Sequence, residues 1–228
     1  ICEPEDLLSE LAATSCHRIA LVAFFCGREG PSSRAIIRRP PRRVPRTIIR
    51  LLEPFLMERK LLSKVWGGRA LEDTLGLELP EDGAPIGESW EVYDRPEGSS
   101  PIRGSDETLG QLVRRCPEEL VGRDVRLGHK GAFPLTLKFL DAREACSLQV
   151  HPSDAQAHDD IGKDECCLIL HTDERASFVH GVREGVEPSA FFESWTTDAV
   201  HSMLYTFRPE PGQFVHTRPG VPHSLGPG

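Results

Sequence analysis

Short apolar segments separated by turn-forming residues dominate the chain beyond Gly131. Five of them are rich in β-branched, aromatic and other apolar residues, and we predict a strand in each: residues 134–142, 147–152, 165–172, 176–182 and 213–219. Several short strands at this spacing are typical of a β-sandwich or a jelly-roll barrel. The hydrophobic pattern therefore predicts a mainly β fold.

Two stretches have helical patterns instead. In residues 105–122, apolar residues recur at i, i+3 and i+4, Asp106 or Thr108 can cap the N-terminus, and Pro117 should break or restart the helix. Residues 187–207 indicate one or two further short helices. The expected fold is thus mainly β with a few short helices.

The first 48 residues differ from the rest. Residues 6–25 could form a helix, but seven arginines and three prolines then fall between Arg34 and Arg50. A run so rich in arginine and proline cannot form a buried core, and it favours an extended or disordered segment. It could serve as a tether to nucleic acid or membrane; we instead predict a poorly ordered leader over residues 1–48 and one domain over residues 49–228.

Composition narrows the class of protein. The net charge of -8 and the pI near 5.6 argue against a general nucleic-acid binder, which needs a basic surface. The longest apolar run, residues 19–26, is too short to span a membrane. Seven cysteines without a C-x-x-C pair favour a reducing, cytoplasmic setting. We therefore expect no nucleic-acid or membrane partner.

Candidate chemistry gathers around residues 147–165. In a strand, Gln149 and His151 would project from one face, and an antiparallel return of the chain would bring Glu165 beside them. His223 lies in a Gly/Pro-rich segment that we expect at a mouth of the barrel. An amide oxygen, two imidazoles and a carboxylate suit zinc or another divalent first-row ion with open coordination positions. The spacing alone leaves a metal site and an ordinary polar strand rim as open alternatives.

Several segments together resemble the type I phosphomannose isomerases, zinc-dependent enzymes of the cupin superfamily. The segment LKFLDAREACSLQVHPSDAQA resembles the family segment with a Q-V-H-P core, GKDE resembles the segment that supplies a carboxylate ligand, and RPGVPHSLGPG resembles a family turn. Upstream, LEPFLMERKLLSKVWGGRAL and PIGESWEVYDRPEGSS resemble the start of the shorter bacterial members. The likeness runs in order from about Arg50 to Gly228.

The resemblance implies a cupin-type jelly-roll barrel that interconverts mannose 6-phosphate and fructose 6-phosphate, a small sugar phosphate being the only implied partner. It implies one Zn²⁺ per chain and three groups of site residues. The metal ligands would be Gln149, His151, Glu165 and His223; the catalytic residue would be Lys163; and the substrate would be bound by Ser147, Lys163 and Glu88.

One departure from the family leaves alternatives open. Relatives continue beyond the position of Gly228 into a segment with a Y-R-x-Y-D-W-x-R motif, so we expect the barrel to be incomplete at its C-terminus. A non-catalytic cupin that binds metal or sugar is the main alternative. An iron oxygenase is another, against which Gln149 argues. The sequence indicates neither a general base nor an oligomeric state.

Overall fold

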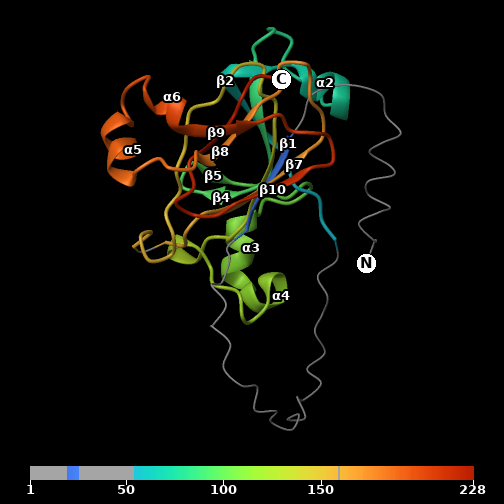
Figure 1. Ribbon diagram of the computed structural model, residues 1–228. Coiled ribbons are helices and arrows are strands. Elements are labelled where there is room, and N and C mark those ends of the chain that lie inside the picture. Colours follow the sequence, from blue (N-terminus) through green and yellow to red (C-terminus); the bar gives the residue numbers. More distant parts are fainter. Residues whose placement is uncertain (1–19, 26–53, 159) are drawn as a thin grey trace.

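The regular secondary structure is mainly β-sheet. The computed structural model describes residues 20–25, 54–158 and 160–228, and its strands form three antiparallel sheets (Figure 1). The largest has the order β10-β7-β1-β6-β3-β2, the second β11-β8-β9, and the smallest β4-β5. The strands are β1 Ala20–Phe25, β2 Lys60–Gly68, β3 Ile86–Val92, β4 Asp94–Arg95, β5 Gly98–Ser99, β6 Thr136–Leu140, β7 Asp164–Ile169, β8 Phe178–Val182, β9 Leu204–Phe207, β10 Phe214–Thr217 and β11 His223–Leu225.

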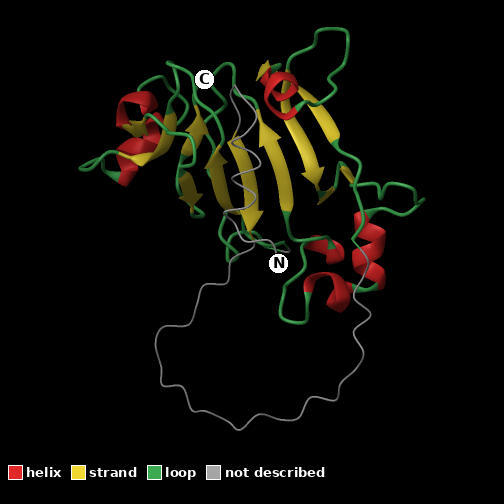
Figure 2. Cartoon of the chain, turned by 90° about the vertical axis from the view of Figure 1, so that its right-hand side faces the viewer, coloured by secondary structure: helices red, strands yellow, loops and turns green. Residues whose placement is uncertain are grey.

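Short helices lie at the periphery of the sheets (Figure 2). They are α2 Ala70–Leu75, α3 Leu109–Arg115, α4 Pro117–Val121, the 3₁₀ turn η1 His129–Gly131, α5 Pro188–Ser194 and α6 Val200–Met203. The helical stretch predicted over residues 105–122 is confirmed: Thr108 and Gln111 form a capping box at α3, and Pro117 starts α4. The stretch over residues 187–207 is confirmed by α5 and α6 but is wrong at its end, where residues 204–207 form strand β9. In the part of the chain that is described, no helix combines the length and the apolar character needed to cross a bilayer.

A hydrophobic core joins the two larger sheets. Leu140, Cys167 and Val215 of the six-stranded sheet pack with Phe178 of the three-stranded sheet. Trp66, Phe207 and Leu225 are partly buried against this cluster. The two sheets therefore face each other, and a residue that projects inward from either sheet enters a shared interior.

Four of the five predicted strands are present as β6, β7, β8 and β10. The fifth is wrong: residues 147–152 form no strand, and only Gln149 makes an isolated bridge, with His223. His223 itself begins β11, whereas we expected it in a turn. The pattern also missed β2 and β3, because β3 carries polar residues that break the apolar alternation.

Strand β1 comes from the segment that the sequence assigned to the leader. It pairs antiparallel with β6 on one side and with β7 on the other, so it is an interior strand of the six-stranded sheet. The helix expected over residues 6–25 is therefore wrong for residues 20–25, because a short apolar run fits a buried strand as well as a helix. The domain division after residue 48 stays a prediction, and the other leader residues lie outside the described part of the chain.

A buried carboxylate ties α2 to the end of β6. Asp141, only 1% exposed, accepts a hydrogen bond from the backbone N–H of Ala70 at 2.6 Å. A Cβ at Gly68 would lie 2.8 Å from both carboxylate oxygens of Asp141, so glycine allows this close approach. The contact fixes the chain direction between β2 and α2.

Replacing Asp141 with Ala should destabilise the fold, because the buried N–H of Ala70 would lose its acceptor. Such a loss costs about 1–3 kcal/mol, which for a domain of this size lowers the melting temperature by about 2–10 °C. Asp73→Ala, an exposed carboxylate on the same helix, is the matched control and should melt close to the unmodified chain. Equal melting of the two variants in differential scanning calorimetry would contradict this role.

Candidate metal site

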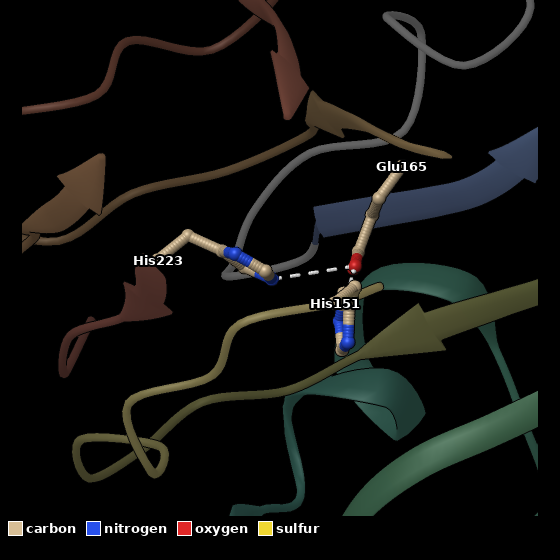
Figure 3. Close-up of side chains that lie close together, drawn as sticks. All are labelled: His151, Glu165 and His223. Atoms are coloured by element: carbon tan, nitrogen blue, oxygen red, sulfur yellow. Dashed lines mark ion pairs between the residues drawn. The ribbon is translucent and has the colours of Figure 1, made fainter. Parts of the chain in front are cut away.

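Three potential ligand side chains meet between the two larger sheets. His151 lies in the connection between β6 and β7, Glu165 is in β7, and His223 begins β11 (Figure 3). One ligand atom from each lies within 4.8 Å of the others. Glu165 Oε2 is 2.9 Å from His151 Nε2 and 3.3 Å from His223 Nε2. The segments are distant in sequence, so the tertiary fold brings the three together.

The site is electrostatically suited to a cation. Burial would raise the pKa of Glu165, but the nearby imidazoles of His151 and His223 and the charge of Lys163 outweigh it, and the pKa lies far below its ordinary range. Burial lowers the pKa of His151 despite the opposing effect of Glu165. The carboxylate is therefore ionised and His151 favours its neutral form, the states in which these groups bind metal.

The orientation of His223 leaves a lone pair at the centre of the site. Its Nδ1 lies 2.9 Å from the backbone oxygen of Val221, which can only accept a hydrogen bond, so Nδ1 carries a proton. In the neutral imidazole Nε2 is then an acceptor, and it faces an acceptor oxygen of Glu165. Among the described residues, neither His223 Nε2 nor Glu165 Oε2 has a hydrogen-bond partner, although both are buried. Two facing lone pairs require a proton or a cation between them, so the residues fit a metal ion.

Gln149 also lies beside the cluster, although it is not in the regular strand that the sequence predicted. Its backbone exchanges two hydrogen bonds of 2.9 Å with His223. It also lines a cavity of about 50 Å³ together with Glu165 and His223. An isolated bridge to β11, and not a regular strand, thus brings Gln149 beside the cluster.

Lys163 and Glu88 are both close to the cluster. Lys163 Nζ lies 2.7 Å from His151 Nε2 and 3.5 Å from Glu165 Oε2, and burial lowers its pKa to about 8. Glu88, only 7% exposed, lines the 50 Å³ cavity and binds Lys138 at 3.1 Å and the indole N–H of Trp90 at 2.6 Å. Burial would raise the pKa of Glu88, but Lys138 and these hydrogen bonds lower it overall.

Ser147 is exposed, and the residues that line the cavity do not include it. Lys138, which was not among the residues predicted from the sequence, lines the cavity from β6. One signal was present: a lysine in the middle of the apolar strand LTLKFL is unusual unless its charge has a partner. Glu88 is that partner, and it comes from a segment 50 residues away.

Comparison with known proteins is consistent with this geometry. The family description "Phosphomannose isomerase type I, catalytic domain" matches residues 55–176. A mannose-6-phosphate isomerase of Streptococcus mutans is 28% identical over 183 residues, which are 78% of this chain and 56% of the relative. The crystal structure of the mannose 6-phosphate isomerase from Bacillus subtilis is 27% identical with a TM-score of 0.64, over 76% of this chain and 55% of that one.

A more distant structure, a mannose 6-phosphate isomerase bound with zinc and yttrium, shares the fold at 14% identity. Its TM-score is 0.52, and the match covers 76% of this chain and 66% of that one.

The sheets and the cluster define a mainly β protein of the cupin class with a potential metal site. The match to more than half of its residues shows that the chain belongs to the type I phosphomannose isomerase family. It spans about half the length of the curated relatives that it matches.

Proposed function

We propose that the chain holds one zinc ion through Gln149, His151, Glu165 and His223 and isomerises mannose 6-phosphate and fructose 6-phosphate. The observation that carries this proposal is the pair of buried acceptors, His223 Nε2 and Glu165 Oε2, which face each other at 3.3 Å without a hydrogen bond between them. The donor set is of the mixed N/O type that zinc accepts. The zinc-bound structure of similar fold supports the choice of metal.

The reaction moves a proton between C1 and C2 of the sugar, and negative charge develops on the sugar oxygens. A bound zinc ion supplies Lewis acidity toward this charge. Lys163 donates hydrogen bonds to substrate oxygens, since its ammonium group lies beside His151 and Glu165. Glu88 binds the substrate from the wall of the same cavity. Ser147 has the weakest support, because it is exposed and outside the cavity lining.

The test measures metal content and isomerase activity on the same preparation of the full chain. We expect about one zinc per chain by elemental analysis and conversion of mannose 6-phosphate in a coupled assay. Chelation should abolish the conversion, and added zinc should restore it. The cytoplasmic setting stays a prediction from the sequence.

The two readouts separate this proposal from its alternative. Zinc without turnover would indicate a cupin that binds metal or sugar but does not catalyse the isomerisation. A folded chain that binds no divalent metal would contradict the isomerase proposal and would leave only a cupin that binds sugar without metal, because a proton would then lie between His223 Nε2 and Glu165 Oε2.

A further inference from the structure

Strand β1 lies between two strands that line the metal cavity. The sheet order β7-β1-β6 places it there, and β1 runs beside β7 in Figure 1. Glu165 and Cys167 of β7 line the 50 Å³ cavity, and so do Lys138 and Leu140 of β6. The position of β1 therefore sets how far apart these two groups of lining residues lie.

The strand register places β1 level with the metal site. Phe24 of β1 lies opposite Glu165 of β7 on one side and opposite Thr136 of β6 on the other. Adjacent strands lie about 4.7–4.9 Å apart, so one inserted strand keeps β6 and β7 about 10 Å apart. Without β1, β7 would either lie one strand spacing closer to β6 or leave its backbone groups unpaired on that side. Either change would displace Glu165.

The backbone of Glu165 is held between two strands. Phe24 pairs with it on one side, and Thr217 of β10 pairs with it on the other. Its carboxylate must also reach two imidazoles, because Oε2 lies 2.9 Å from His151 Nε2 and 3.3 Å from His223 Nε2. A functional metal site tolerates errors of only about 0.5 Å in the position of its ligands. The loss of one flanking strand is therefore much larger than the error that the site tolerates.

The two imidazoles are held by contacts in which β1 takes no part. His223 begins β11, and its backbone exchanges two hydrogen bonds of 2.9 Å with Gln149. The backbone oxygen of His151 accepts a hydrogen bond of 2.8 Å from the N–H of Gly220. A disturbance of β1 therefore acts on the carboxylate ligand and leaves the supports of both histidines in place.

We propose that β1 is a positioning strand for the metal site: it separates β6 from β7 and thereby holds the Glu165 carboxylate at the distances from His151 and His223 that metal binding requires. The inference rests on the proposed function, because it concerns the same metal site. The coupling is reciprocal, so bound metal stabilises the pairing of β1 by the same free energy by which β1 favours metal binding. Metal affinity and the exposure of the β1 backbone should therefore change together.

The first experiment measures the zinc affinity of the full chain and of Ala23→Pro by competition with a chelator, below the melting temperature of each. Ala23 lies opposite Cys166 of β7 and Leu137 of β6, and proline removes its N–H and one hydrogen bond of the ladder. Loss of the groups that support a metal ligand weakens metal affinity about 10- to 100-fold, and we expect a loss of this size. Co²⁺ bound in place of zinc should show a changed visible spectrum, because the ligand geometry changes.

Ala23→Gly is a milder variant that keeps the backbone N–H and only adds conformational freedom to the strand. Its zinc affinity should fall in the same direction as that of Ala23→Pro but by less. It replaces the proline variant in the comparison if the latter does not fold.

Asp141→Ala is the control for a general loss of stability. Its contact fixes α2, and its melting temperature should fall by an amount similar to that expected for a proline in β1. Its zinc affinity and its Co²⁺ spectrum should nevertheless equal those of the unmodified chain. A purely structural role of β1 would give Ala23→Pro the same unchanged affinity and spectrum.

Hydrogen exchange on the unmodified full chain tests the reciprocal effect without a substitution. Added zinc should slow the exchange of backbone amides in β1 and β7. The amides of β2, at the far edge of the same sheet, should change little.

Two results would overturn the inference. One is a folded Ala23→Pro or Ala23→Gly variant with the zinc affinity of the unmodified chain, and the other is zinc that protects the amides of β7 but not those of β1. Either leaves the proposed isomerase intact, since the unmodified chain still binds zinc. Zinc binding that depends on β1 in a chain without turnover would support the inference and reject the isomerase. A folded, unmodified chain that binds no divalent metal rejects both.

Discussion

Replacing His223 with Ala should abolish stoichiometric metal binding, from about one zinc per chain to none detectable. The side chain supplies a buried Nε2 whose lone pair is directed at Glu165, and its Nδ1 is committed to Val221. Alanine removes this metal-binding nitrogen, and the Glu165 carboxylate then has a single imidazole neighbour. A zinc site with open positions commonly has only three or four protein ligands, so the loss of one should be severe.

His216→Ala is the control for this experiment. His216 is also a strand histidine, but it pairs with Asp164 and is not part of the cluster. The His216→Ala variant and the unmodified chain should both contain about one zinc per chain by elemental analysis. Unchanged zinc in a folded His223→Ala variant would refute the ligand assignment, and Glu165→Ala offers an independent repeat at the carboxylate.

Proline at position 22 should destabilise the six-stranded sheet. Val22 lies opposite Lys138 of β6 and Cys167 of β7, so its backbone belongs to an interior strand. Proline has no N–H to donate and removes a ladder hydrogen bond, which leaves a buried acceptor unpaired. The expected cost is about 1–3 kcal/mol, or about 2–10 °C in melting temperature for a domain of this size.

Val22→Ala is the reference for that comparison, because it shortens the side chain and keeps the backbone N–H. The difference between the two variants in thermal unfolding isolates the backbone contribution. If the two variants melt at the same temperature, residue 22 does not pair within the sheet, and the predicted division of the chain after residue 48 would be supported.

The strands that the sequence identified were those whose apolar character is continuous, as in β7, where Cys166 and Cys167 are both buried. Strand β3 escaped notice because it carries Glu88 and Ser89, which are buried as well. Their burial depends on partners such as Lys138, and a local pattern does not contain that information. Residues 20–25 show the opposite error, since the chain neighbours of an apolar run do not determine whether it forms a helix or a strand.

Candidate site residues could be named from the sequence, whereas the geometry that brings them together could not. The sequence identified His151, Glu165 and His223 through the family resemblance, and the fold brings them together. The expected mechanism, a hairpin between two strands, is wrong, because β7 pairs with β1 and β10 instead.

The positions of Glu165 and His223 also link metal binding to folding. Glu165 belongs to the six-stranded sheet and His223 to the three-stranded sheet, so an ion held by both would cross-link the two layers. An ion that binds the assembled site but not the unfolded chain adds to the free energy of unfolding in proportion to the logarithm of its free concentration. Metal supply would then set how firmly the two layers are joined as well as whether the site is loaded.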